Sequence, residues 1–218
     1  MTPWIFFREH RAEILGATAD HLTLVLIAMA FAIAIGVPLA MLIVHRKTLR
    51  NIALTLASIF QTIPSLALFG FLIPIPFIGG IGRRTAIVAL VLYALLPILR
   101  NTYVGLTGID PAVLEAAEAM GMTQSQILLR VRLPLARAVI LAGIRTATII
   151  TIGVATIAAA IGAGGLGTFI FRGVAMVSDA VILAGAIPAA LLAIAADLLL
   201  GLLERRLKIN YSHSSSSL

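Results

Sequence analysis

Long apolar runs separated by short polar stretches dominate the pattern of this chain. Each of five runs can cross, or nearly cross, about 30 Å of hydrocarbon as a helix. These predicted spans cover residues 22–44, 52–75, 86–102, 135–161 and 180–203. The pattern therefore predicts an all-α integral membrane protein with five transmembrane helices.

The composition supports this assignment and narrows the possible functions. The 218-residue chain is 61% hydrophobic and 11% charged, whereas soluble domains carry roughly 25% charged residues. It contains no cysteine, which excludes disulfides, thiol chemistry and cysteine-ligated metals. The net charge of +7 comes from short basic groups between apolar runs. That distribution suits an anionic membrane surface and indicates no nucleic-acid partner.

One polar stretch, residues 110–134, is patterned more carefully than its surroundings and reads DPAVLEAAEAMGMTQSQILLRVRLP. Asp110 can cap a helix, and Pro111 suits the first helical position. Gly121 can end that helix in a left-handed conformation. The sequence therefore predicts one short helix with a defined start and end.

A second short helix is predicted directly after the glycine. Thr123 can cap its start, and Gln126 three residues later completes a capping box. We expect Pro134 to limit this helix. Two bounded helices joined at Gly121 indicate a rigid loop and not a passive linker.

The distribution of Lys and Arg predicts the orientation of the spans. One side holds ten of these residues: Arg46, Lys47, Arg50, Arg100, Arg130, Arg132, Arg137, Arg205, Arg206 and Lys208. The other side holds five: Arg8, Arg11, Arg83, Arg84 and Arg172. The positive-inside rule therefore puts the N-terminus outside, and both the 110–134 loop and the 205–218 tail in the cytoplasm.

The first twenty residues precede the predicted spans. Residues 1–20 are expected to form an external interfacial segment, with Trp4, Phe6 and Phe7 at the lipid headgroups. A partly ordered tail is the alternative.

No catalytic set is evident in the sequence. The four histidines have no metal-ligand spacing, and no Ser/His/acid set is identifiable. The chain also has no GxxxxGK[ST] phosphate loop. We therefore expect no cofactor in this chain, and any ATP and Mg²⁺ would be bound by a partner ATPase.

The glycine-rich sequence GAGGLG at 162–167 follows a predicted transmembrane helix, so it is not expected to be a phosphate loop. Two roles remain open for Gly162, Gly164, Gly165 and Gly167. They can form a plain tight turn, or they can allow the close helix approach of an outer gate.

Polar side chains inside the spans give two further hypotheses. Gln61, Thr62 and Ser65 can line a translocation path, or they can form hydrogen bonds between helices. Arg145 and Asp197 lie at a similar depth with opposite charge, which predicts a pair between the fourth and fifth spans. Snorkelling of Arg145 or separate partners are the alternatives.

The segment EAAEAMGMTQSQILLRVRLPLA resembles the EAA signature of permeases in ABC importers. The resemblance assigns coupling to an ATPase to Glu115, Ala116, Ala117, Glu118, Gly121, Leu133 and Pro134. It implies the type I importer permease core in a bacterial cytoplasmic (inner) membrane. It also implies two ABC ATPase subunits, a second permease copy or paralogue, and an external substrate-binding protein.

Four further segments resemble permeases of osmoprotectant importers, which carry glycine betaine, choline or carnitine. They are QTIPSLALFGFLIP, LYALLPILRNTYVGL, LAGIRTATIITIGVATIAAAIGAGGLG and LAGAIPAALLAI, and the resemblance extends over residues 21–204. Permeases for amino acids or methionine share this five-span core and are the nearest alternative. An ATP-independent carrier would need a coupling-ion site, and a membrane enzyme would need a catalytic set.

Overall fold

The computed structural model describes residues 3–207, and helices account for all of the regular secondary structure in that range. In chain order the elements are α1 (Pro3–Glu9), α2 (Arg11–Ile43), α3 (Lys47–Thr62), α4 (Ser65–Leu72), α5 (Arg83–Thr107), α6 (Pro111–Ala119), α7 (Gln124–Ile127), the π-helix η1 (Leu128–Arg132), α8 (Leu133–Ile157), the 3₁₀-helix η2 (Ala158–Ile161), α9 (Gly167–Ala175) and α10 (Asp179–Leu207). The predicted all-α architecture is confirmed.

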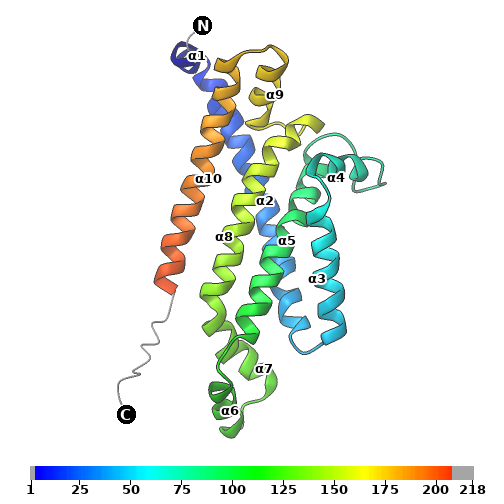
Figure 1. Cartoon of the computed structure of the whole chain (residues 1–218), viewed down its shortest axis with the longest axis vertical. Helices are drawn as coiled ribbons and strands as arrows, with labels where there is room; N and C mark the ends of the chain where they lie inside the picture. Colours follow the sequence, from blue (N-terminus) through cyan, green and yellow to red (C-terminus); the bar gives the residue numbers. More distant parts are fainter. Residues whose placement is uncertain (1–2, 208–218) are drawn as a thin grey trace.

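Four stretches of the described chain are long and apolar enough to cross a membrane without a break. They are α2, α5, the continuous helical stretch from α7 to η2, and α10. They run side by side along the long axis of the molecule (Figure 1). The bent pair α3 and α4 is the fifth candidate, with 106° between the two helices.

The predicted span over residues 52–75 is not one continuous helix, because the chain turns sharply in its middle. Pro64 lacks a backbone N–H and disfavours a helical conformation in the residue before it. Accordingly Ile63 is extended, with ψ of 128°, and α4 starts only at Ser65. The α3 helix therefore follows the other spans, whereas α4 lies across them (Figure 1).

The N-terminal segment is helical and packed in the described range. Phe6 of α1 is buried in an apolar cluster with Phe169 of α9 and Val181 of α10. The α2 helix starts at Arg11, earlier than the predicted span, and its 33 residues extend about 50 Å. Residues 11–20 are thus the first turns of α2, and a partly ordered tail does not describe them.

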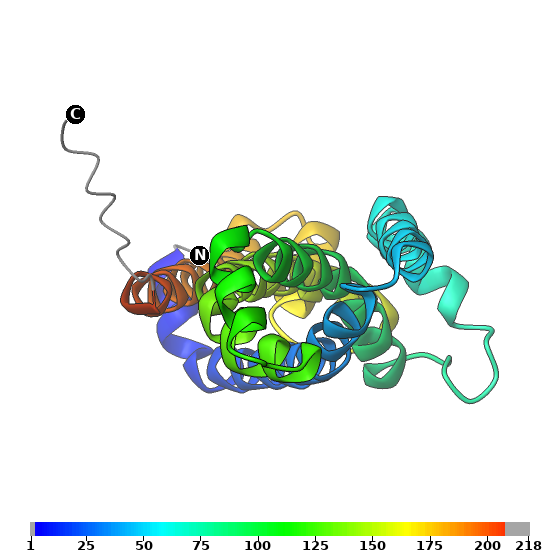
Figure 2. The same cartoon turned by 90° about the horizontal axis from the view of Figure 1, so that it is seen from below.

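Close approach between α2, α5 and α8 forms the centre of the molecule, and small residues make this possible. A Cβ atom on Gly143 of α8 would lie 2.6 Å from the Cβ atom of Asn101 on α5. A Cβ atom on Gly36 of α2 would lie 2.8 Å from Cγ2 of Ile98 on α5. Seen from below, α10 and the α3–α4 pair lie on opposite flanks of this centre (Figure 2).

The two ends of the molecule carry different elements. The α1, α4 and α9 helices gather at one end, and α6 and α7 lie at the other (Figure 1). The α10 helix runs to Leu207, so the first residues of the predicted 205–218 tail are helical. The rest of that tail, with Lys208, lies outside the described residues.

Candidate coupling and translocation sites

The first helix of the 110–134 loop, α6, has the start and end that its sequence predicts. The Asp110 carboxylate accepts a hydrogen bond from the backbone N–H of Ala112 at 2.9 Å. At the other end Gly121 has φ of +77°, a left-handed conformation that favours glycine. The N–H of Met122 then donates to the carbonyl of Ala117 at 3.2 Å, which closes the helix end.

The second helix, α7, begins with the predicted capping box. The Thr123 hydroxyl accepts from the backbone N–H of Gln126 at 3.4 Å, and the Gln126 side chain accepts from the Thr123 N–H at 2.8 Å. The Gln124 amide also donates to the Glu118 carboxylate at 3.0 Å. This last bond ties α7 to α6 across the glycine, so the loop is held as one unit.

The prediction that Pro134 limits the second helix is wrong. Helical structure runs without a break from Gln124 through η1 and α8 to Ile161. Before the proline, the Leu133 N–H donates to the Leu128 carbonyl, a π-type bond five residues back. Wider π geometry relieves the collision that a proline ring otherwise makes with a preceding carbonyl. The loop is therefore joined directly to α8.

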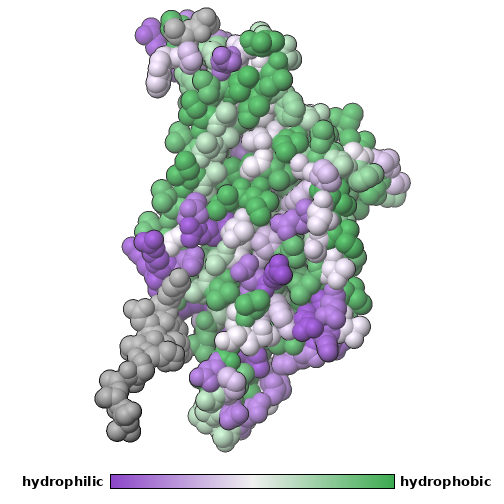
Figure 3. Space-filling model, in the orientation of Figure 1, coloured by the Kyte–Doolittle hydropathy of each residue, from purple (hydrophilic) through white to green (hydrophobic). Residues whose placement is uncertain are grey.

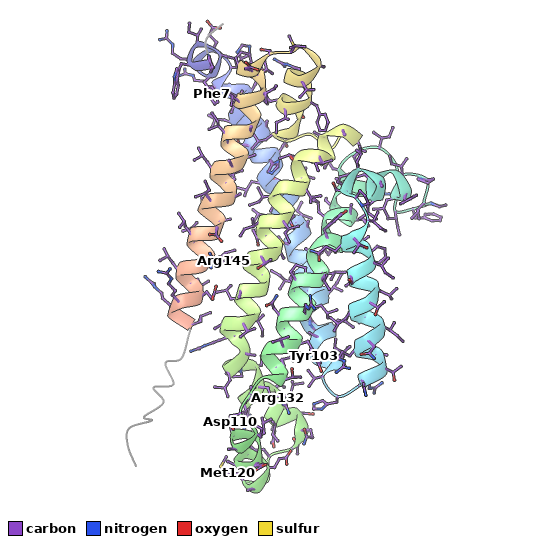
Figure 4. The ribbon with its side chains drawn as sticks, viewed as in Figure 1. Phe7, Tyr103, Asp110, Met120, Arg132 and Arg145 are labelled. Atoms are coloured by element: carbon purple, nitrogen blue, oxygen red, sulfur yellow. The ribbon has the colours of Figure 1, made fainter. Side chains whose placement is uncertain are left out.

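An arginine fixes the base of this loop to the membrane core. The Arg132 guanidinium in η1 donates to the carbonyl of Leu106 near the end of α5 at 2.8 Å. Arg132 lies where the loop meets the spans, between Asp110 and Tyr103 in the view of Figure 4. This contact is not predictable from the pattern of the sequence, in which Arg132 is one of ten Lys and Arg residues on the same side of the membrane.

The EAA segment divides into an inner and an outer face. Ala117 is buried, with 2% of its surface exposed, and so supports the loop from within. Glu115, Ala116 and Glu118 are exposed, and Met120 at the tip is 74% exposed (Figure 4). Two acids, a small residue and a methionine thus face away from the core. Farther along the motif, Leu133 is half-buried and Pro134 is exposed.

The predicted path residues lie together at the break between α3 and α4. The Thr62 hydroxyl donates to the Ile59 carbonyl of its own helix at 2.8 Å. Neither Gln61 nor Ser65 forms a side-chain hydrogen bond to another helix in the described part of the chain. Among the described residues, these three side chains therefore form no hydrogen bonds between helices, which was the alternative role predicted for them.

A tyrosine from another helix, not predicted from the sequence, supports this break. Helix breaks leave backbone groups without their usual partners. The buried Tyr93 hydroxyl of α5 donates to the carbonyl of Ile63, the extended residue before Pro64. The sequence signal for the break was Pro64 itself, whereas the tyrosine stands 30 positions away in sequence.

The glycine-rich sequence forms the turn between η2 and α9, at the end of the molecule opposite the 110–134 loop. Gly162, Gly164 and Gly165 all have positive φ, between +75° and +83°. Gly167 permits a close approach, because a Cβ atom there would lie 1.8 Å from the Thr156 carbonyl oxygen. Both the tight turn and the close approach are present, and the gate role stays a prediction.

The predicted contact between Arg145 and Asp197 is present. The guanidinium Nε lies 2.6 Å from Oδ1 of Asp197, which joins α8 to α10 (Figure 4). A second acid, Glu204, lies 3.3 Å from Nη1 of the same arginine. Gly201 leaves room for the guanidinium, since a Cβ atom there would lie 3.0 Å from its central carbon. Sequence reasoning missed Glu204, which follows Asp197 by two helical turns on the same face.

With this geometry established, sequence comparison identifies the family. Residues 32–209 match the family described as binding-protein-dependent transport system inner membrane component. The chain belongs to this family. It is therefore a transmembrane permease subunit of an ATP-driven importer, and the fold and the 110–134 loop are those of a type I importer permease.

Several curated permeases resemble this one over most of their length. The carnitine transport permease protein OpuCD of Listeria monocytogenes serotype 1/2a is 48% identical over 188 residues, covering 86% of this permease and 83% of its own chain. The glycine betaine/carnitine/choline permease OpuCD of Bacillus subtilis is 44% identical, covering 93% and 87%. The osmoprotectant import permease OsmW of Salmonella typhimurium is 45% identical, covering 91% and 94%.

Solved structures resemble the permease in fold. One is an inward-facing conformation of the MetNI methionine ABC transporter, with a TM-score of 0.80 and 25% identity, covering 90% of this permease and 96% of that chain. Another is an amino acid ABC transporter with histidines, with a TM-score of 0.79 and 19% identity, covering 94% and 99%. The second likeness supports the fold alone.

Proposed function

We propose that this permease forms the translocation path of an importer for quaternary-ammonium compatible solutes, namely glycine betaine, carnitine or choline. The observation that carries the proposal is the 44–48% identity to permeases named for these solutes over most of both chains. The likeness to the methionine and amino acid transporters is 25% or less. An amino acid or methionine importer is therefore the less favoured alternative.

Other subunits supply the remaining chemistry in this proposal. Two ABC ATPases bind ATP and Mg²⁺, an external binding protein delivers the solute, and a second permease copy or paralogue completes the path. The N-terminus lies outside and the C-terminus in the cytoplasm, as the counts of Lys and Arg favour. Gln61, Thr62 and Ser65 line the path, and the glycines at 162–167 contribute to an outer gate.

The 110–134 loop is the contact with the ATPase. Glu115, Ala116 and Glu118 present acidic and small side chains to that partner, and Gly121 sets the direction of the loop. Rigid connection through α7 and η1 into α8 transmits motion of the ATPases to the membrane helices. The caps, the Gln124–Glu118 bond and the Arg132 anchor support this role.

Uptake in cells tests the substrate class. The permease is expressed with its cognate ATPase and binding protein in a strain that lacks its own compatible-solute importers. At high osmolarity we expect saturable uptake of at least one radiolabelled solute among glycine betaine, carnitine and choline. Excess methionine or histidine should not compete. Uptake of methionine or histidine alone would contradict the proposal.

Co-purification tests the coupling contact. Glu115→Ala should reduce recovery of the ATPase with the tagged permease, because it removes an exposed charge from the proposed contact. The matched control is Glu9→Ala, which removes an exposed acid at the opposite end of the molecule. Equal recovery of the ATPase with both variants would show that Glu115 does not contribute to the contact.

A further inference from the structure

A polar hollow lies between α3 and α5, apart from the coupling loop. Its volume is about 370 Å³. The polar part of its lining is Thr55, Ser58 and Thr62 from α3 and Arg100 from α5, and leucine and isoleucine side chains complete it. Binding pockets for small molecules have volumes of roughly 300–1,000 Å³. The hollow is therefore at the small end of that range and suits a small solute.

The hydroxyl side chains of this hollow share one face of α3. Thr55, Ser58 and Thr62 are spaced by three and four residues, which places them above one another on a helix. Other positions of α3 expose large apolar side chains, with Ile52 and Leu56 about half exposed. The helix thus has an apolar face suited to lipid and a hydroxyl face suited to water or a solute.

Arg100 stands out among the arginines near the spans. It lies seven residues before the end of α5, about 10 Å along the helix, and its side chain is exposed. It forms no ion pair or side-chain hydrogen bond among the described residues, whereas Arg132 and Arg145 both do. An unpaired charge inside a membrane is costly, and such side chains face the bundle interior or a water-filled cavity.

The surface around this arginine is also consistent with a water-filled path. Figure 3 shows pale and purple residues interspersed with green ones over the middle and lower part of the face that carries α5 and α8. Thr146 and Gly153 of α8 are exposed, and Thr62 belongs both to the hollow and to the predicted path residues. The hollow therefore shares Thr62 with the residues predicted to line the path.

The lining chemistry selects one kind of ligand. A planar guanidinium with nearby hydroxyl donors recognises carboxylate groups through charge-assisted hydrogen bonds. The lining contains no acidic residue and no aromatic ring, and a quaternary ammonium group is usually held by aromatic faces. On its own, this hollow would repel a solute that carries only positive charge.

We propose that this hollow is a transient binding site for the carboxylate of a small zwitterionic solute, with Arg100 as the principal contact and Thr55 and Ser58 as supporting donors. The inference rests on the proposed function and narrows it. Glycine betaine and carnitine carry a carboxylate beside the quaternary ammonium, whereas choline carries none. The permease therefore favours the first two solutes over choline.

Uptake by the complete importer in proteoliposomes tests this site. The importer contains the permease, its partner permease, the ATPase and the binding protein, and the probes are radiolabelled glycine betaine and choline. Arg100→Gln should lower glycine betaine uptake at limiting concentration by about tenfold or more, which corresponds to one lost charge-assisted hydrogen bond. Arg100→Lys should lower glycine betaine uptake less, because the positive charge remains. Some loss is still expected, because the ammonium group lacks the two-pronged guanidinium geometry that matches a carboxylate. Choline uptake should not fall, because choline has no carboxylate for Arg100 to bind and removal of the positive charge relieves its repulsion.

The matched control is Arg137→Gln, which removes an exposed charge near the start of α8, outside the hollow. Each variant is also checked for assembly and for ATPase stimulation by loaded binding protein. Should Arg100→Gln fail to assemble, Thr55→Val and Ser58→Ala should each lower glycine betaine uptake several-fold with choline uptake kept.

Three results would overturn the site. The first is glycine betaine uptake by Arg100→Gln, or by both hydroxyl variants, equal to uptake by Arg137→Gln. The second is an equal loss of glycine betaine and choline uptake in Arg100→Gln. The third is transport of choline, but of no carboxylated solute, by the unaltered importer. Absence of uptake of all three quaternary amines by the unaltered importer would instead contradict the proposed function, so the two failures are distinguishable.

Discussion

At the scale of single residues, two arginines within the spans have different surroundings. Arg145 is held by Asp197 and Glu204, and it links two long helices. Arg100 lines the polar hollow between α3 and α5 and forms no ion pair among the described residues. The first arrangement stabilises the contact between α8 and α10, and the second suits a ligand.

The Arg145 contact gives a prediction about stability. Asp197→Asn should lower the thermal midpoint of the purified permease, because the arginine loses its closer charged partner. Glu204→Gln should lower it less, since that contact is 3.3 Å and not 2.6 Å. The measurement is thermal unfolding in detergent. The combined variant Arg145→Asp with Asp197→Arg should lose less stability than the sum of the two single charge reversals, Arg145→Asp and Asp197→Arg.

An unchanged midpoint in Asp197→Asn would mean that the pair contributes nothing to stability. A combined variant as unstable as the sum of its parts would mean that the two side chains act independently.

Residue-scale predictions from sequence succeeded where helical spacing set the geometry. The shared depth of Arg145 and Asp197 followed from the rise of a helix. Glu204 was missed because it was assigned to the segment after the fifth span, whereas α10 continues past it to Leu207. The clash that excludes a side chain at Gly167 depends on the path of the turn back toward Thr156, which sequence spacing does not contain.

At the scale of elements, the broken second span depends on a contact from another helix. Tyr93→Phe removes the hydroxyl that donates to the Ile63 carbonyl at the break. We expect a loss of about 1–3 kcal/mol in the free energy of unfolding, the usual cost of leaving a buried polar group without its partner.

Denaturant unfolding measures this loss. The matched control is Tyr103→Phe, whose hydroxyl accepts from Arg50 in a more exposed position. Such a contact contributes about 0–1 kcal/mol. Equal effects of the two variants would show that Tyr93 does not support the break.

The capping box of α7 gives a prediction about coupling. Thr123→Ala removes the side chain that accepts from the Gln126 N–H, at a cost of about 1 kcal/mol to the helix start. We expect fewer solute molecules imported per ATP hydrolysed, because the loop transmits motion less rigidly. Ser125→Ala is the control, since this exposed serine lies in the same helix and does not cap it. An unchanged ratio in Thr123→Ala would contradict the rigid-loop account.

Sequence patterns predicted the caps of these elements well, because capping depends on residues three or four apart. The continuity from α7 into α8 was not predictable in the same way. Pro134 is a helix breaker by local rules, and the π-turn before it accommodates the ring. The Arg132 bond to the Leu106 carbonyl holds that turn against α5, and it joins residues 26 apart in sequence.

At the scale of the whole molecule, one continuous helical stretch connects the two ends. It runs for 38 residues from Gln124 to Ile161, or about 57 Å. The 110–134 loop stands at one end, and the glycine-rich turn at 162–167 stands at the other (Figure 1). In the role proposed for this loop, a movement imposed by a partner ATPase would therefore reach the opposite end through α8.

The hydrophobic pattern predicted this overall plan, since the number and order of spans follow from apolar runs of sufficient length. It did not predict which helices meet. The central contacts depend on single small residues such as Gly36 and Gly143, whose partners lie on another helix. The α9 helix was also missed, because its N-cap residue Leu166 has no capping side chain, whereas Asp110 and Thr123 mark the starts of α6 and α7.

The most direct measurement of the central claim follows ATP hydrolysis and solute import together in proteoliposomes that contain the complete importer. Radiolabelled glycine betaine, carnitine and choline are supplied with the binding protein on the outside, and ATP is supplied to the ATPase. We predict that at least one of these solutes accumulates against its gradient only when ATP, ATPase and binding protein are all present. Accumulation by the permease alone without ATP would contradict the account, as would steady ATP hydrolysis without import of any of the three.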